Sequence, residues 1–85
     1  MTNDVLVSEM RNIGPTSSQW LRNVGILTAA DLAHIGSATA YRIVKEAGYP
    51  ASLNLLYGME AALRDIDWRN LDHSEKEQLR LEAGD

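Results

Sequence analysis

Two segments of the chain repeat one pattern, and this repeat constrains the fold more than any other feature. "MRNIGPTSSQWL" at 10–21 and "LAHIGSATAYRI" at 32–43 both read apolar-x-x-Ile-Gly-x-x-x-small-x-x-apolar, with Gly14 and Gly36 22 residues apart. Such a pattern is typical of a helix, a tight hairpin and a second helix, in which Gly permits a backbone angle that other residues avoid and the small residue lets helices approach. The repeat predicts two tandem units of this kind at about 6–47.

Turn and capping residues divide the first half into short helices. Pro15 suits the first turn of a helix, because its missing N–H would have no partner there, and Gly25 is placed to end that helix in a left-handed cap. Thr28 is the expected N-cap of "AADLAHI". We expect Ser37 to cap the next run, which "GYP" ends.

The second half predicts two more helices. Ser52 precedes an apolar stripe at helical spacing in "LNLLYGMEAALRDI", which predicts a core helix at 52–66. Ser74 and Glu77 form a capping-box pattern that opens a polar terminal helix at 74–84. No segment alternates long enough to be a strand. We predict one all-α domain over 1–85, a SAM-like bundle of five or six short helices.

The apolar periodicity also predicts the core, and we expect both tryptophans to be packed in it. Trp20 falls on Arg42 in the repeat, so the alternative for Trp20 is a place at the core edge or on a partner surface. The predicted core residues are Ile13, Leu21, Val24, Leu32, Ile35, Ala40, Ile43, Val44, Leu53, Leu56, Met59 and Leu63.

Charge and composition limit the possible partners. The net charge of −4 lies entirely in residues 52–85, because residues 1–51 hold equal numbers of acidic and basic side chains. The neutral first half is therefore the part that can approach phosphate. The chain has no Cys and no apolar run long enough to cross a bilayer, from which we expect a cytoplasmic protein without membrane contact.

The repeat resembles the helix-hairpin-helix family, whose paired hairpins hold DNA through backbone N–H groups at the start of each second helix. In that family the hairpin reads Gly-apolar-Gly with a Lys or Arg soon after. Here Asn12 and His34 stand at the first Gly position, and Thr16 and Ala38 stand where Lys often follows. The residues that the resemblance, with nearby basic side chains, assigns to DNA are Asn12, Gly14, Thr16, Ser17, Gly36, Ala38, Thr39, Arg11, Arg22, Arg42 and Lys45.

A longer match covers residues 12–68. "NIGPTSSQWLRNVGILTAADLAHIGSATAYRIVK", followed by "SLNLLYGMEAALRDIDW", resembles the C-terminal domain of the TfoX (Sxy) competence regulators. The resemblance implies a small helical domain that longer members join to a separate N-terminal domain. It also implies a role in transcription of DNA-uptake genes together with the cyclic-AMP receptor protein.

Two functions remain open, and neither is catalytic. The sequence contains no nucleophile elbow, Walker loop, dinucleotide fingerprint or metal-ligand spacing, so we expect no enzyme, cofactor, metal site or small-molecule substrate. The first hypothesis is a regulatory module that docks a protein near Trp20, either its family's N-terminal domain or the transcription machinery. The alternative is weak, sequence-independent binding of the DNA backbone at the hairpins.

Overall fold

The computed structural model describes residues 5–84, which are folded entirely into helices and connecting turns. It contains the five α-helices and two short 3-10 helices of this range, and no strand. The predicted all-α class is confirmed; the ends of the predicted domain, residues 1–4 and 85, lie outside the described residues. The elements are η1 (Val7–Glu9), α1 (Pro15–Asn23), α2 (Ala29–Ile35), α3 (Ser37–Glu46), α4 (Leu53–Arg64), η2 (Trp68–Asn70) and α5 (His73–Glu82).

Local signals place the first two helices where the sequence predicted them. Pro15 opens α1, and Gly25 follows that helix with a φ of 89°. Thr28 caps α2 by accepting a hydrogen bond from the backbone N–H of Asp31 at 3.1 Å. The Asp31 carboxylate accepts the N–H of Leu27 and of Thr28 in return, and these hydrogen bonds lower the pKa of Asp31 below its usual value.

Two capping predictions were wrong. Ser37 is the first residue of α3, not its cap, and its hydroxyl donates to the Glu60 carboxylate. Ser52 occupies the N-cap position of α4, although its side chain makes no cap hydrogen bond. Asp72 caps α5 with Glu75 in a reciprocal capping box, so the helix begins before the predicted Ser74.

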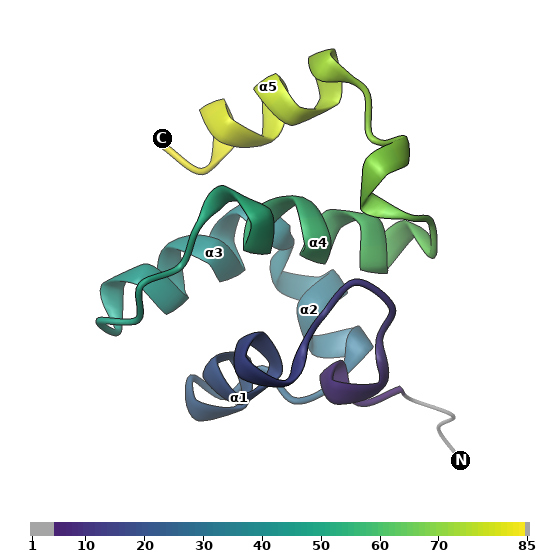
Figure 1. The fold of residues 1–85 in the computed structure, drawn as a ribbon. Helices are drawn as coiled ribbons and strands as arrows, with labels where there is room; N and C mark the ends of the chain where they lie inside the picture. Colours follow the sequence, from purple (N-terminus) through teal and green to yellow (C-terminus); the bar gives the residue numbers. More distant parts are fainter. Residues whose placement is uncertain (1–4, 85) are drawn as a thin grey trace.

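Helix α4 lies across the middle of the molecule, with α5 on one side and α1 with the N-terminal segment on the other (Figure 1). It packs against α2, α3 and α5, whereas α1 packs on η1 and α3. The segment before η1 is fixed by backbone hydrogen bonds to the turn before α2, from Val7 to Leu27 at 2.9 Å and from Ala29 to Val5 at 2.7 Å.

The core is built around the α4 stripe, as predicted, but it is wider. Val24, Ile35, Ile43, Leu53 and Leu63, all predicted core, are only half-buried. The predicted residues that are buried are Ile13, Leu21, Leu32, Ala40, Val44, Leu56 and Met59. The buried apolar residues that the prediction missed are Val7, Ile26, Tyr41, Leu55, Ala61, Ala62, Leu71, Leu79 and Ala83.

The two repeats do not have the same hairpin. In the second unit Gly36 adopts a φ of 89°, as the repeat predicted. In the first unit Gly14 has a φ of −82°, and Asn12 adopts the left-handed angle, with a φ of 73°. The prediction of an unusual angle at Gly14 was therefore wrong. The two Ile-Gly pairs have different backbone conformations, because α2 continues through Ile35, whereas no α-helix precedes Asn12 in the described residues.

Leu56→Ala should destabilise the domain strongly. The Leu56 side chain is fully buried in the middle of α4, and its truncation would leave a cavity that costs about 2 to 5 kcal/mol. Urea unfolding followed by circular dichroism measures the loss. Leu81→Ala, at a residue that is 67% exposed on α5, serves as the control and should change the stability by less than about 0.5 kcal/mol. Equal stability of the two variants would contradict this core assignment.

Candidate functional site

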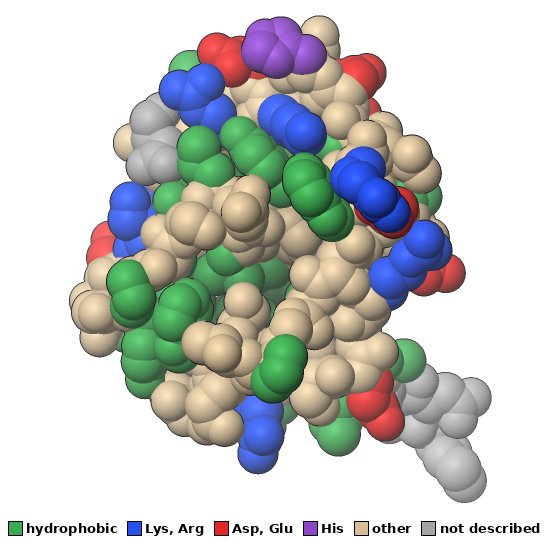
Figure 2. All heavy atoms as spheres, viewed as in Figure 1, with side chains coloured by type: hydrophobic (Ala, Val, Ile, Leu, Met, Phe, Trp, Pro, Cys, Tyr) green, Lys and Arg blue, Asp and Glu red, His purple; other side chains and the backbone are tan. Residues whose placement is uncertain are grey.

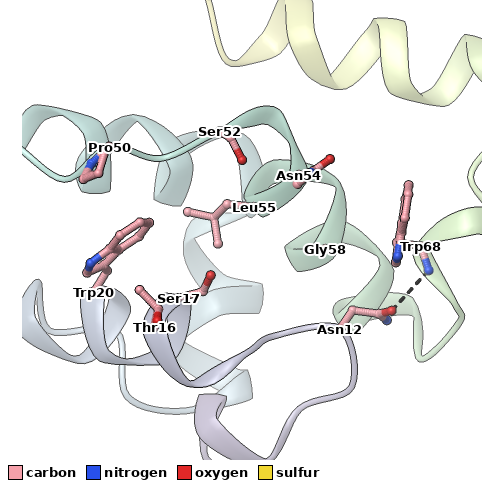
Figure 3. Close-up of a pocket in the computed structure, with 10 residues that line it drawn as sticks. All are labelled: Asn12, Thr16, Ser17, Trp20, Pro50, Ser52, Asn54, Leu55, Gly58 and Trp68. Atoms are coloured by element: carbon pink, nitrogen blue, oxygen red, sulfur yellow. Dashed lines mark hydrogen bonds between the residues drawn. The ribbon is translucent and has the colours of Figure 1, made fainter.

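A groove of about 360 Å³ separates α1 from α4 beside the first hairpin (Figure 3). Leu55 and Gly58 of α4 line it together with Trp20 of α1. None of its lining residues carries a charge. The full lining is Asn12, Thr16, Ser17, Trp20, Pro50, Ser52, Asn54, Leu55, Gly58 and Trp68.

Trp20 forms one end of the groove. Its ring stacks on that of Tyr49, with centroids 5.6 Å apart and planes 21° from parallel. The Tyr49 hydroxyl accepts a hydrogen bond from the Asn23 amide at 3.0 Å, so the stack is held from two elements. Trp20 is half-buried and packs against the core, so the structure agrees with the alternative of a core-edge position and not with the expected place inside the core. Part of its ring is open to the groove.

Asn12 joins the first hairpin to the end of α4. Its side-chain amide donates to the Ile66 carbonyl at 2.6 Å, and its side-chain oxygen accepts the Trp68 backbone N–H at 3.2 Å. Asn12 adopts the left-handed backbone angle, with a φ of 73°. Its side chain connects the hairpin to residues more than fifty positions away in the sequence.

Gly58 allows this connection because it lets the hairpin touch the backbone of α4. A Cβ placed at Gly58 would lie 2.8 Å from the Asn12 carbonyl oxygen, closer than real Cβ contacts. The glycine is helical and has an ordinary φ, so its role is steric and not conformational.

Trp68 stands at the other end of the groove and is 40% exposed, so the prediction that it belongs to the core was wrong. The Lys76 ammonium lies 5.2 Å from the Trp68 ring centroid and 5.5 Å from that of Tyr57. Such cation–π contacts hold the ring and the charge together. Figure 2 shows the hollow in the centre of this face, with hydrophobic surface at its floor and Lys and Arg side chains along part of its rim.

A short ion-pair network surrounds the Trp68 end. Arg69 donates to both carboxylate oxygens of Asp67, at 3.1 and 2.8 Å, and this pairing, with the Arg69 backbone N–H, holds the pKa of Asp67 well below its usual range. Arg11 is close enough to lower that pKa further by its charge. The Asp67 carboxylate therefore neutralises Arg69 at this end of the groove.

The two predicted phosphate-binding turns differ in their surroundings. At the first, no side chain caps the start of α1, and Thr16 and Ser17 line the groove. At the second, the Ser37 hydroxyl donates to the Glu60 carboxylate at 2.7 Å, beside Ala38 and Thr39. A carboxylate there repels phosphate, although no side chain caps the start of α3 either. Sequence reasoning missed Glu60 because it lies 23 residues away from Ser37.

The structure does not bring the four predicted basic residues together. Arg11 borders a more apolar hollow of about 600 Å³ between the N-terminal segment, α2 and the end of α4. Arg22 borders a separate hollow with Leu6 and Leu27, and the Lys45 ammonium lies over the Tyr41 ring at 5.3 Å. Arg42 is exposed on α3. None of the four lines the groove beside the first hairpin.

Other kinds of site find no support in the part of the chain that the structure describes. Within residues 5–84, no three or more His, Cys, Asp or Glu side chains are grouped so that they could hold a metal ion. Over the same range, no helix combines the length and the apolar character needed to span a membrane.

Gly58→Ala should destabilise the domain by up to about 2 kcal/mol, even though Ala favours a helix. The gain in helix propensity is about 1 kcal/mol, whereas forcing a methyl group against the Asn12 carbonyl costs about 1 to 3 kcal/mol. Asn54→Ala, at an exposed position of the same helix, is the control and should not destabilise. Greater stability of Gly58→Ala in urea unfolding would refute the close approach.

Asn12→Gly should cost about 1 to 3 kcal/mol, because it keeps the left-handed backbone angle but removes both hydrogen bonds. Asn12→Ala should cost roughly 1 kcal/mol more, since it adds backbone strain. Thermal unfolding of the three proteins separates the two effects. If Asn12→Gly is as stable as the unaltered protein, the side-chain connection does not contribute.

Comparison with known proteins agrees with this geometry. The model of the TfoX C-terminal domain matches residues 3–83, and this family is a regulatory, non-catalytic type of domain. The triclinic crystal structure of an uncharacterized protein from Listeria monocytogenes has a TM-score of 0.83 and 33% sequence identity, covering 89% of this chain and 86% of that one. The curated proteins gave no match. The chain belongs to the TfoX C-terminal domain family.

Proposed function

We propose that this domain is a regulatory interaction module of the TfoX type, which docks a protein partner in the groove between α1 and α4 and so contributes to transcriptional control of DNA uptake. The single observation that carries the proposal is Trp20, stacked on Tyr49 at the end of an uncharged groove and partly open to it. Aromatic side chains in partly desolvated hollows are the residues that most often dominate binding energy at protein interfaces.

The lining of the groove supports a protein partner. Leu55 and the two tryptophan rings offer apolar contact, while Thr16 and Asn54 offer hydroxyl and amide groups. An apolar centre with a polar, uncharged rim is the usual composition of a protein interface. The candidate partners are the N-terminal domain of the same family and the transcription machinery, including the cyclic-AMP receptor protein, and the absence of Cys suits action in a reducing cytoplasm.

Binding of the DNA backbone is the second candidate, and the first hairpin is the observation that favours it. The start of α1 has no side-chain cap, so the N–H groups of Thr16 and Ser17 are available to a phosphate oxygen. Three observations weigh against it: the net charge of −4, the Glu60 carboxylate at the second hairpin, and the scatter of the basic residues. Any affinity for DNA would be weak and strongly salt-dependent.

A pair of NMR titrations of the labelled domain tests the two candidates. With the cyclic-AMP receptor protein or a TfoX N-terminal domain, we expect shifts at the Trp20 indole N–H and at the amides of Thr16 and Ser17. With short duplex DNA at low salt, we expect no joint shift of Gly14 to Ser17 and Gly36 to Thr39. Joint movement of both hairpins on DNA, without a response to either protein, would replace the first function with the second.

Trp20→Ala should weaken binding of the responding protein at least about tenfold, the loss of about 1.4 kcal/mol or more that is typical of an aromatic anchor. Gln19→Ala, at the neighbouring exposed position of α1, is the matched control and should leave the affinity unchanged within about twofold. Circular dichroism of both variants confirms that they are folded. Equal affinities of folded Trp20→Ala and Gln19→Ala would place the docking surface elsewhere.

A further inference from the structure

The lining of the groove is uncharged, and the Lys76 ammonium lies beside its Trp68 end. This distribution of charge indicates the chemistry of the partner. We propose that the groove takes an extended acidic peptide segment, whose backbone lies along the uncharged lining and whose carboxylates meet Lys76 beside Trp68. The inference rests on the proposed function, since it names the kind of segment that the docked protein would supply.

The lining suits a peptide backbone because it offers unused neutral hydrogen-bonding groups. The side chains of Thr16, Ser17, Ser52 and Asn54 make no hydrogen bond to any other described residue, and they stand on both walls of the groove (Figure 3). An extended peptide presents N–H and C=O groups alternately, and hydroxyl and amide side chains can pair with either kind. Leu55 and the tryptophan rings provide apolar contacts for its side chains.

The charges at the Trp68 end suit an acidic segment. Lys76 lies over the rings of Trp68 and Tyr57, and among the described residues no carboxylate is within ion-pairing distance of its ammonium. Arg69 is paired with Asp67, and Arg11 borders a different hollow that Glu9 and Asp65 also line. Lys76 is therefore a cation without a paired carboxylate that stands beside Trp68, at one end of an otherwise uncharged groove.

This charge distribution does not suit a nucleic-acid strand. A phosphodiester chain carries a negative charge at every nucleotide, and its binding sites place basic side chains along the whole track. Here the ten lining residues include neither Lys nor Arg, and Lys76 lies beside one end of the groove, over Trp68. A segment with an acidic portion and a neutral portion matches the groove better than a uniformly charged strand.

The two tryptophans of the chain provide a direct measurement, because both line the groove. The complete domain is panned against a displayed library of random linear peptides, and the enriched peptides are synthesised and titrated while tryptophan emission is followed. We expect enrichment of Asp and Glu over Lys and Arg, a change of emission on binding, and a Kd that rises with salt.

Charge variants test the assigned contacts. Lys76→Gln should raise the Kd of the selected peptides about twofold to fivefold, as for an exposed ion pair. Arg22→Gln makes the same charge change in a different hollow and should leave the Kd unaltered. Substituting glutamine for the acidic residues of the peptide should reproduce the loss and remove the effect of Lys76→Gln.

The outcomes separate the two proposals. Peptides that alter the emission and depend on Trp20, but show no acidic enrichment and no response to Lys76→Gln, overturn this inference and leave the docking function in place. Enriched peptides that bind without altering the emission overturn both, as does failure to enrich any peptide. An oligothymidylate that alters the emission more strongly than every selected peptide would assign the groove to nucleic acid instead.

Discussion

The contact between Asn12 and the end of α4 is the constraint on which the arrangement of the domain depends. The side-chain amide of Asn12 donates to the Ile66 carbonyl, and its side-chain oxygen accepts the backbone N–H of Trp68. The backbone carbonyl of Asn12 lies against Gly58. This contact fixes the first hairpin beside α4 although α1 itself packs on α3 and η1. The space left between α1 and α4 becomes the groove, so one side chain at a turn determines both the position of the hairpin and the existence of the candidate site.

A second set of contacts fixes the opposite side of α4. Ser37 at the start of α3 donates to Glu60, Glu60 pairs with Arg64 one turn later, and Arg64 also pairs with Glu75 at the start of α5. The hydrogen bond from Arg64 lowers the pKa of Glu75. The chain of contacts joins three helices through exposed or half-exposed side chains, which contribute less to stability than the apolar core does. Its clearer consequence is functional, because it places a carboxylate where the second hairpin would need to receive a phosphate.

The two repeats have therefore diverged in what their hairpins can do. Neither α1 nor α3 has a side-chain cap at its start, but the first hairpin lies beside a groove with aromatic ends, whereas Ser37 at the start of α3 donates to the Glu60 carboxylate. A symmetric pair of hairpins following one DNA backbone requires equivalent geometry and free N–H groups in both units. The observed asymmetry instead concentrates the accessible chemistry around Trp20 and Trp68, which is why we place docking of a protein segment ahead of DNA binding.

Local chemistry determined the helices, and tertiary contacts determined the site. Pro15 and Thr28 act on the backbone within one helical turn, so the helix starts that they mark were predictable from sequence. The periodicity of α4 likewise predicted that Leu56 and Met59 would be buried, because helical spacing alone puts them on one face. Where two signals competed locally, as with Asp72 and Ser74 before α5, the sequence did not decide which one capped the helix.

The groove could not be predicted, because its parts come from four separate segments and depend on how those segments pack. The sequence pointed to Trp20 and to the turn at Asn12, but not to the exposure of Trp68 or to Lys76 above its ring. Nor did the shared Ile-Gly pattern reveal that Ser37, at the start of α3, donates a hydrogen bond to Glu60. Short-range capping and periodicity specify elements by themselves, whereas the placement of charges and aromatic rings from distant segments is settled only when the core is packed.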